Sequence, residues 1–172
     1  MLYFWKLDRK SKMKQNKIHL LILIFIATFL QSCEHDDICI DEITPHLIIR
    51  LYDKANTTAL KKINKVDIAI VGLDRQVKTI EAKDSILLPI DVSKDITQYI
   101  LTINSKTPET KQSDTITISY TREDIFVGRS CGYKTIFNDM IYKLDSDNWI
   151  HHIESISSQI ENENNAHVKI FF

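Results

Sequence analysis

Residues 115–120 read Thr-Ile-Thr-Ile-Ser-Tyr, a strict alternation of small hydroxyl side chains with large apolar or aromatic ones. Successive side chains of a β-strand point to opposite faces of the sheet, so this order places Ile116, Ile118 and Tyr120 together on one face. An amphipathic helix would instead repeat its apolar residues every three or four positions. The stretch therefore predicts a β-strand with one face on an apolar core and the other toward water.

The same kind of pattern recurs along the chain. Ile, Val and Thr supply 24, 6 and 12 of residues 33–172, and these β-branched side chains favour strands over helices. Similar runs predict strands at Leu47–Tyr52, Val66–Ile70, Ile86–Val92, Gln98–Asn104, Ile125–Phe137 and His167–Phe172. Trp149–Ile160 fits a strand or a short helix, because its isoleucines also approximate helical spacing, and we expect a strand.

Polar segments separate these runs. Asp53–Lys62 and Asn104–Asp114 have the composition of loops, and Asn162–Asn165 has that of a turn. Seven to eight short strands with few helices predict an all-β fold, an antiparallel β-sandwich of the immunoglobulin type or a similar one. We expect this domain to span residues 44–172.

The N-terminus follows a different pattern, in which six basic residues among the first 17 positions precede the apolar run Leu20–Leu30. This order is typical of a secretory signal peptide, and the run is shorter than the roughly 20 residues that a transmembrane helix needs. The sequence Leu-Gln-Ser-Cys at positions 30–33 resembles the lipobox of bacterial lipoproteins, whose cysteine receives a diacylglycerol before the chain is cut in front of it. We expect residues 1–32 to be a cleaved lipoprotein signal peptide and residues 33–43 to form a lipidated, acidic tether. An uncleaved anchor helix is the alternative.

The chain has three cysteines. If lipidation uses Cys33, then Cys39 and Cys131 remain, and a lone pair in an exported chain is most simply a disulfide. Two free buried thiols are the alternative. The chain lacks the CxxC or clustered histidine spacing that a zinc site would need.

The charge of the mature chain restricts its partners. Without residues 1–32 it carries sixteen basic against 22 acidic residues, a net charge of −6. This balance argues against nucleic acid and against a polybasic grip on anionic lipid. We therefore expect the lipid on Cys33 to hold the protein to the membrane.

Several blocks of the chain resemble one family. They are Thr121–Val127, Arg129–Lys134, Asp147–Ile150, Ile160–Glu163 and Ala166–Phe171, together with Thr44-Pro45 and Leu51–Asp53. These blocks resemble a lipoprotein family of the Bacteroidota that is catalogued only as a domain of unknown function. The resemblance covers nearly all of the chain after the lipobox, and the family has the same lipobox and the same early and late cysteines. It implies a cell-envelope address, and it implies no known catalytic residue, cofactor or substrate.

The acidic residues directly behind Cys33 bear on the location. In Bacteroidota such a stretch resembles the signal that sends lipoproteins to the outer face of the outer membrane, although a solvated tether has the same composition. We expect a lipid-anchored envelope protein of the outer membrane, and the sequence leaves open whether it faces the periplasm or the cell surface.

The chain contains no recognisable enzyme motif. GxSxG, HExxH and P-loop sequences do not occur, and three glycines offer little for a phosphate-cradling loop. On a strand, His151 and His152 would point to opposite faces, and the adjacent carboxylates Glu123 and Asp124 are typical of a solvated strand end. We expect no catalytic, metal-binding or cofactor-binding residue and no cofactor.

The expected function is a non-enzymatic binding or accessory domain for another envelope component, such as an outer-membrane protein. The alternative is a surface module that binds carbohydrate or a small ligand. Its candidate aromatic side chains are Tyr133, Phe137, Tyr142 and Trp149, although core packing explains them at least as well. An enzyme of unrecognised type is the third possibility.

Overall fold

The computed structural model describes residue 39, residues 44–72 and residues 76–172, all within one compact unit, Cys39–Phe172. These residues form nine strands and no helix. The strands are β1 (Leu47–Tyr52), β2 (Ile63–Ile70), β3 (Gln76–Lys83), β4 (Ser85–Leu88), β5 (Ile96–Ile103), β6 (Gln112–Gly128), β7 (Gly132–Leu144), β8 (His152–Ser155) and β9 (Val168–Phe171). The all-β prediction is confirmed, with nine described strands in place of the seven or eight expected.

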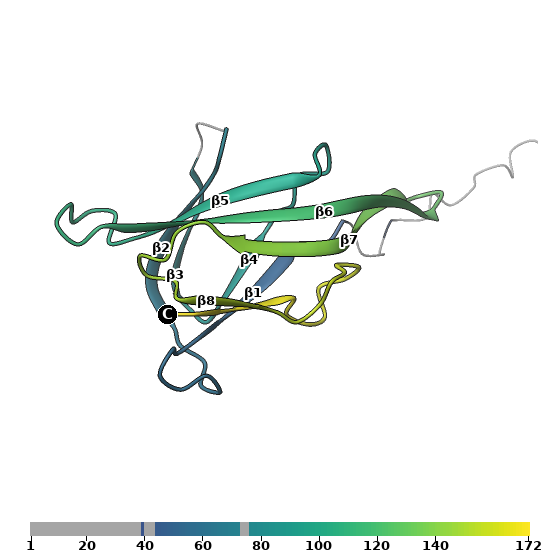
Figure 1. Cartoon of the computed structure of the whole chain (residues 1–172). Helices are drawn as coiled ribbons and strands as arrows, with labels where there is room; N and C mark the ends of the chain where they lie inside the picture. Colours follow the sequence, from purple (N-terminus) through teal and green to yellow (C-terminus); the bar gives the residue numbers. More distant parts are fainter. Residues whose placement is uncertain (1–38, 40–43, 73–75) are drawn as a thin grey trace, which may run out of the picture. The chain divides into compact units, whose positions relative to one another are not determined.

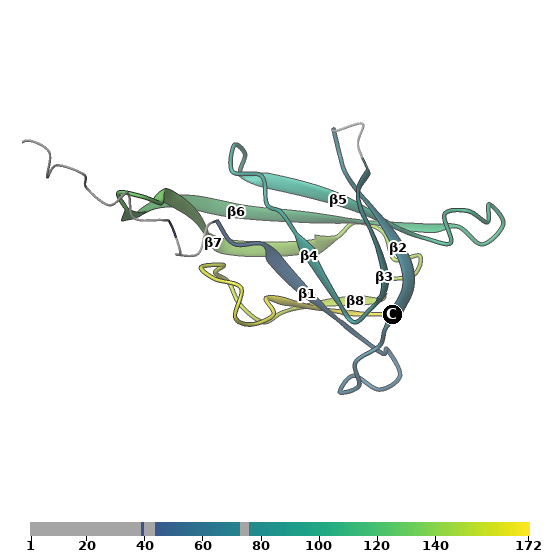
Figure 2. The same cartoon turned by 180° about the vertical axis from the view of Figure 1, so that it is seen from behind.

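The strands form two sheets. One sheet has the order β4-β1-β9-β8 and the other has the order β3-β2-β5-β6-β7. Figure 1 shows β5, β6 and β7 in one layer with β1 and β8 in the other, and Figure 2 shows β1 and β4 from behind. The chain passes from one sheet to the other between β3 and β4, where only Asp84 separates the two strands. The arrangement is consistent with a β-sandwich.

The core lies between the sheets, and alternation along the strands fills it. In β1, Leu47, Ile49 and Leu51 are buried while the residues between them are partly exposed. In β6, Ile116 and Ile118 are buried in the same way, as the sequence predicts. Side chains from both sheets belong to a single apolar cluster.

One strand pair departs from the predicted antiparallel pattern. β1 and β9 run parallel, with Ile49 opposite Val168 and Leu51 opposite Ile170, whereas the other named strand pairs are antiparallel. Parallel neighbours need a long connection rather than a tight turn, and here the connection is almost the whole domain.

The strand boundaries also correct the sequence-based expectation. The stretch Ile125–Phe137 is not one strand, because it contains the end of β6, a turn and the start of β7. Within Trp149–Ile160 only β8 is a strand, and Asn104–Asp114 is a loop only as far as Lys111. β3 was not predicted at all. Its sequence, Gln-Val-Lys-Thr-Ile-Glu-Ala-Lys, has few apolar residues and reads as polar linker.

Candidate functional site

Cys39 and Cys131 form a disulfide, with their Cα atoms 4.9 Å apart and their positions 92 apart in sequence. This pairing is confirmed. Cys131 lies in the turn between β6 and β7, so the bond ties the start of the domain to the tip of that hairpin. Cys33, the predicted lipidation site, lies outside the described residues.

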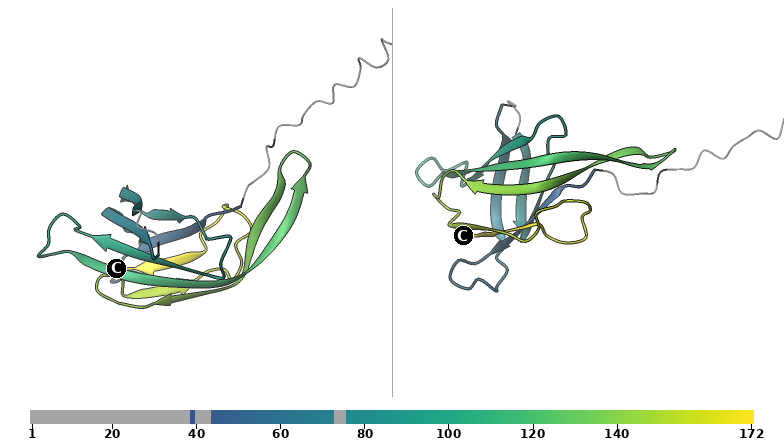
Figure 3. Two further views of the ribbon diagram at one scale, coloured as in Figure 1. Left: turned by 90° about the horizontal axis from the view of Figure 1, so that it is seen from above. Right: turned by 45° about the vertical axis from the view of Figure 1, so that its right-hand side comes forward.

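The β6–β7 hairpin is longer than the core that it covers. β6 has 17 residues, and its side chains from Asp114 to Tyr120 alternate between buried and partly buried. From Thr121 to Phe126 every side chain is exposed. The outer part of the hairpin therefore projects beyond the core, and Figure 3 shows it bending away from the other strands.

A β-bulge marks the point where the hairpin leaves the core. The register shifts between Ser119 and Thr121, so that Tyr120 of β6 faces two residues of β7, one of which, Asp139, has a φ of +53°. The N–H of Tyr120 donates to the carbonyl of Asp95 at 3.0 Å, and the Thr121 hydroxyl donates to Asp139 at 2.9 Å. These bonds fix the bend.

The projecting part carries an exposed aromatic pair. Phe126 and Tyr133 lie directly opposite each other across the two strands, with ring centroids 5.3 Å apart in an edge-to-face arrangement. Phe126 is 57% exposed and Tyr133 is 70% exposed. Arg129 in the adjoining turn is exposed too, and Gly132 closes the turn with a φ of +70°. Two large exposed side chains in contact form a candidate binding surface.

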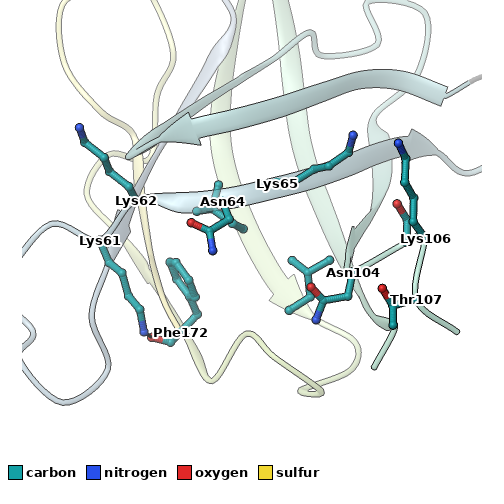
Figure 4. Close-up of a pocket in the computed structure, with 11 residues that line it drawn as sticks. Lys61, Lys62, Asn64, Lys65, Asn104, Lys106, Thr107 and Phe172 are labelled. Carbon is teal, nitrogen blue, oxygen red and sulfur yellow. Dashed lines mark hydrogen bonds between the residues drawn. The ribbon is translucent and has the colours of Figure 1, made fainter. Parts of the chain in front are cut away.

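A second candidate surface lies at the other end of β6. A hollow of about 300 Å³ is lined by residues 61–65, residues 103–107 and Phe172. We call it the lysine hollow, because its lining includes Lys61, Lys62, Lys65 and Lys106. In Figure 4, Lys65 and Lys106 extend in the same direction on one side, and Lys61 reaches toward Phe172 on the other. Ile63, Ile103 and Phe172 supply its apolar surface.

The four lysines differ in their partners. The Lys61 amine lies 3.2 Å from the Asp53 carboxylate, donates to the Phe172 carbonyl at 2.8 Å and sits over the Phe172 ring. The Lys65 amine donates to Glu81 at 3.0 Å, and this hydrogen bond raises the pKa of Lys65. Among the described residues, Lys62 and Lys106 have no ion-pair partner. Two of the four lysines therefore carry a charge that no ion pair in the described part of the chain compensates, and in Figure 4 Lys62 extends away from Asn64 and Phe172.

A third hollow, of about 530 Å³, lies beside the segment between β8 and β9. Its lining, which defines the amide hollow, is Ile156, Ser157, Gln159, Glu161, Asn162, Asn165, Ala166 and His167. His167 is buried, and its Nδ1 atom accepts a hydrogen bond from the Ile48 N–H at 3.0 Å. The ring is therefore neutral, and its Nε2–H donates to the Asn162 carbonyl at 3.1 Å. Burial lowers the pKa of His167, although the Asn162 carbonyl and Glu163 oppose the shift.

Asp114 is a fully buried carboxylate surrounded by backbone hydrogen-bond donors. It accepts hydrogen bonds at 2.7 Å from the backbone N–H groups of Asn148, Trp149 and Ile150. Burial by itself raises the pKa of Asp114, but these three hydrogen bonds, together with the Ser146 side chain, outweigh it, and the net pKa is lowered. With its oxygens engaged by N–H donors, the carboxylate serves to hold the segment after β7 and is poorly placed for acid–base chemistry.

The aromatic residues proposed for carbohydrate binding do not form one surface. Phe137 and Trp149 are buried in the core, and the Trp149 N–H donates to the Leu101 carbonyl at 3.1 Å. The Tyr142 hydroxyl is buried with no hydrogen-bond partner among the described residues. Only Tyr133 of the four is largely exposed.

The carboxylates and histidines considered in the sequence analysis make contacts on the protein surface. Asn138 donates to Glu123 at 3.0 Å and Thr135 donates to Asp124 at 2.7 Å. The His151 ring nitrogen lies 2.9 Å from the Lys54 amine, while the His152 ring packs against a phenylalanine of β9. In the described part of the chain, no three His, Cys, Asp or Glu side chains gather where they could hold a metal ion. Nor does any helix there have the length and apolarity to cross a bilayer.

Comparison with known proteins identifies a family. A family model described as "Family of unknown function (DUF6452)" matches residues 65–172, from within β2 to the end of β9. The chain belongs to this family. No curated protein and no solved structure matches the chain. The DUF6452 match agrees with the sequence resemblance in that both lead to a domain whose activity is not known.

Proposed function

We propose that this DUF6452 protein is a non-enzymatic lipoprotein of the bacterial cell envelope, and that its lysine hollow binds an acidic segment of another envelope protein. The observation that carries the proposal is the gathering of Lys61, Lys62, Lys65 and Lys106 around one hollow. The mature chain as a whole has a net charge of −6, so this local excess of positive charge runs against its composition.

The envelope address rests on the sequence. A basic leader, the apolar run Leu20–Leu30 and a lipobox-like sequence ending at Cys33 are the features of a lipoprotein precursor. The Cys39–Cys131 disulfide supports export, because structural disulfides persist in oxidising compartments. A lipoprotein of the Bacteroidota, held in the outer membrane by acyl chains on Cys33, is the form of the protein that we propose.

The geometry of the hollow suits binding rather than catalysis. Its polar lining consists of amines, amides and hydroxyl groups, and its apolar floor includes Ile103 and the Phe172 ring. Lys62 and Lys106 supply charge that no described carboxylate compensates. A carboxylate-rich segment with one apolar side chain complements such a surface, because charge sets the approach and orientation while the apolar contact adds affinity.

The test is site-specific photo-crosslinking in cells that express the full-length chain. Probes at positions 62 and 106 should each yield an adduct of the same discrete mass. A probe at position 94 is the matched control, because Lys94 is also an exposed lysine and lies just before the opposite end of β5. Equal adducts from all three positions, or none from 62 and 106, would contradict the proposal.

Reversing the charge of the lysines tests whether the partner binds through the lysine hollow or only lies near it. We expect Lys62→Glu with Lys106→Glu to remove the adduct formed by a probe at position 64, and Lys94→Glu to leave it. Raising the salt concentration should weaken the same adduct, because exposed charges are screened within about 8 Å at physiological ionic strength. An adduct that survives both the double reversal and high salt would show that the lysines are not the recognition element.

Glycan binding is a second candidate function, and the amide hollow is the observation that favours it. Gln159, Asn162 and Asn165 line this hollow of about 530 Å³, and amide groups both donate to and accept from sugar hydroxyls. Gln159 already donates to Asn138 at 2.9 Å, which orients its side chain. Binding of purified protein to an array of bacterial glycans, lost in Asn165→Ala and retained in Asn164→Ala, would support this function.

A further inference from the structure

The disulfide limits the distance between the hairpin tip and the proposed lipid anchor. Cys39 lies six positions after Cys33, and at no more than about 3.6 Å per position the two are at most about 22 Å apart. The disulfide then places the Cα atom of Cys131 4.9 Å from that of Cys39. This short stretch of chain and the disulfide therefore set an upper limit on the distance between the hairpin turn and the residue that we propose is anchored in the membrane.

The other end of β6 lies much farther from that anchor. The 17 residues of β6 extend over about 50 Å at roughly 3.3 Å per residue, from the hairpin turn to the loop beside the lysine hollow. Figure 1 shows these two loops at opposite ends of the strand. A domain tethered at its tip can therefore turn the hairpin toward the bilayer and the lysine hollow away from it.

The side chains at the tip match a membrane interface. Phe126 and Tyr133 form an exposed pair, and such aromatic rings favour the headgroup level, where an apolar body and a hydroxyl group are both accommodated. Arg129 projects from the adjoining turn, where its guanidinium can meet lipid phosphates. In water the two rings leave a large apolar area exposed, which contact with lipid would remove.

We propose that the tip of the β6–β7 hairpin, Phe126–Tyr133, rests in the headgroup region of the membrane that carries the anchor. Phe126 and Tyr133 enter the interface, and Arg129 binds the phosphate groups. The tip thereby fixes the orientation of the domain on the membrane. This inference rests on the proposed lipidation of Cys33, which keeps the tip at a high local concentration with respect to lipid and lets a small aromatic surface suffice.

Photo-crosslinking to lipid tests the inference on the processed, full-length lipoprotein. A photoactivatable residue is placed at position 126, 133 or 106, and each protein is reconstituted into vesicles of phosphatidylethanolamine and phosphatidylglycerol. We expect lipid adducts from positions 126 and 133 and none from position 106. Equal lipid labelling at all three positions, or none at 126 and 133, would overturn the inference. So would a protein adduct from 126 and 133 in native envelopes, which would make the tip a protein-docking surface.

A variant tests whether the aromatic pair itself seats the tip. With the probe at position 129, Phe126→Ser combined with Tyr133→Ser should reduce the lipid adduct several-fold, and both side chains are exposed enough for the fold to tolerate the change. An unchanged yield would show that the tether alone holds the tip near lipid. Mass spectrometry of the N-terminal peptide separates the two proposals. An unacylated Cys33 would refute the lipoprotein itself, whereas a tip without lipid contact on an acylated chain would refute only this inference.

Discussion

Asp114 belongs to the inward face of β6, in phase with Ile116, Ile118 and Tyr120. The alternation of the sequence continues back to this residue, but its charge is typical of a loop and hides the pattern. The structure explains why a charge occurs at a core position. One carboxylate satisfies three backbone N–H groups of a segment that has no strand partner there, together with the side-chain amide of Asn148 at 3.0 Å.

We predict that Asp114→Asn lowers the free energy of unfolding by about 3 kcal/mol, since an amide retains one acceptor oxygen and turns an NH₂ group toward N–H donors. Urea denaturation at neutral pH measures the change. Asp147→Asn is the matched control, because Asp147 is exposed and lies just before the same segment.

The lowered pKa of Asp114 also makes the stability of the protein depend on pH. Its stabilising contribution is complete above the pKa of the unfolded chain and is lost as the pH falls through the folded-state pKa. Equal effects of the two substitutions would contradict the role given to Asp114.

His167 leads to a second prediction about stability and pH, because its imidazole ring is buried in the neutral form. Its pKa in the folded protein is lower than the ordinary value of 6.5, so the unfolded chain binds more protons as the pH falls below that value. The stability that neutral His167 provides is therefore complete above about pH 6.5 and declines as the pH drops. Melting midpoints measured between neutral and mildly acidic pH should fall in the wild type and fall less steeply in His167→Gln. Parallel slopes for wild type and His167→Gln would refute the prediction.

At the scale of the elements, the sequence predicted strands well where alternation and burial coincide. β1 and β9 lie where Leu47–Tyr52 and His167–Phe172 indicated, because one face of each packs on the core. The hairpin tip was misread as one continuous strand, because Ile125 and Phe126 before the turn resemble Ile136 and Phe137 after it. Composition along one strand does not reveal a turn whose closure depends on Gly132 and on a disulfide partner 92 positions away.

The candidate surfaces were harder to predict than the strands. Lys61, Lys62 and Lys65 are close together in sequence, which was an available signal, but Lys106 joins them only because β2 pairs with β5 in the folded sheet. The exposed pair of Phe126 and Tyr133 likewise depends on cross-strand register. The one long-range feature predicted from sequence was the disulfide, because the number of cysteines left a single pairing once Cys33 was assigned to lipidation.

The disulfide prediction concerns the hairpin as an element. Closing so long a loop stabilises the folded chain by about 4–5 kcal/mol in the chain-entropy model. We expect Cys39→Ser and Cys131→Ser to lower the melting midpoint equally, and the double variant to be no less stable than either, because all three remove the same bond. Thermal melts of the three variants, with thiol titration of the denatured wild type, provide the measurement. Two titratable thiols in protein from the native envelope, or additive losses in the double variant, would show that the cysteines act separately.

At the scale of the whole molecule, β9 joins the two ends of the described domain. It lies between β1 and β8 in the four-stranded sheet, and the Ile48 N–H reaches His167 across 119 positions of sequence. Val168 and Ile170 bring buried side chains to the core, while the buried Phe171 ring lies against Tyr52. Phe172 packs its ring edge-to-face on Trp149. Without β9, β1 would pair only with β4, and β8 would lose its strand partner.

We therefore predict that a chain ending at residue 161 has no cooperative unfolding transition, because the smaller sheet then falls into unconnected pieces and the core is opened to water. Point variants in β9 grade the effect in chains that keep the whole strand. Ile170→Val removes one methylene from the same strand and should cost about 1 kcal/mol. Lys169→Gln changes the outward face of β9, where the Lys169 amine pairs with Glu154 at 2.7 Å in contact with solvent, and should cost less stability than Ile170→Val does. Urea denaturation followed by circular dichroism and Trp149 fluorescence compares the three. A truncated chain that unfolds cooperatively at the wild-type midpoint, or a larger loss for Lys169→Gln than for Ile170→Val, would show that β9 does not hold the two ends of the domain together.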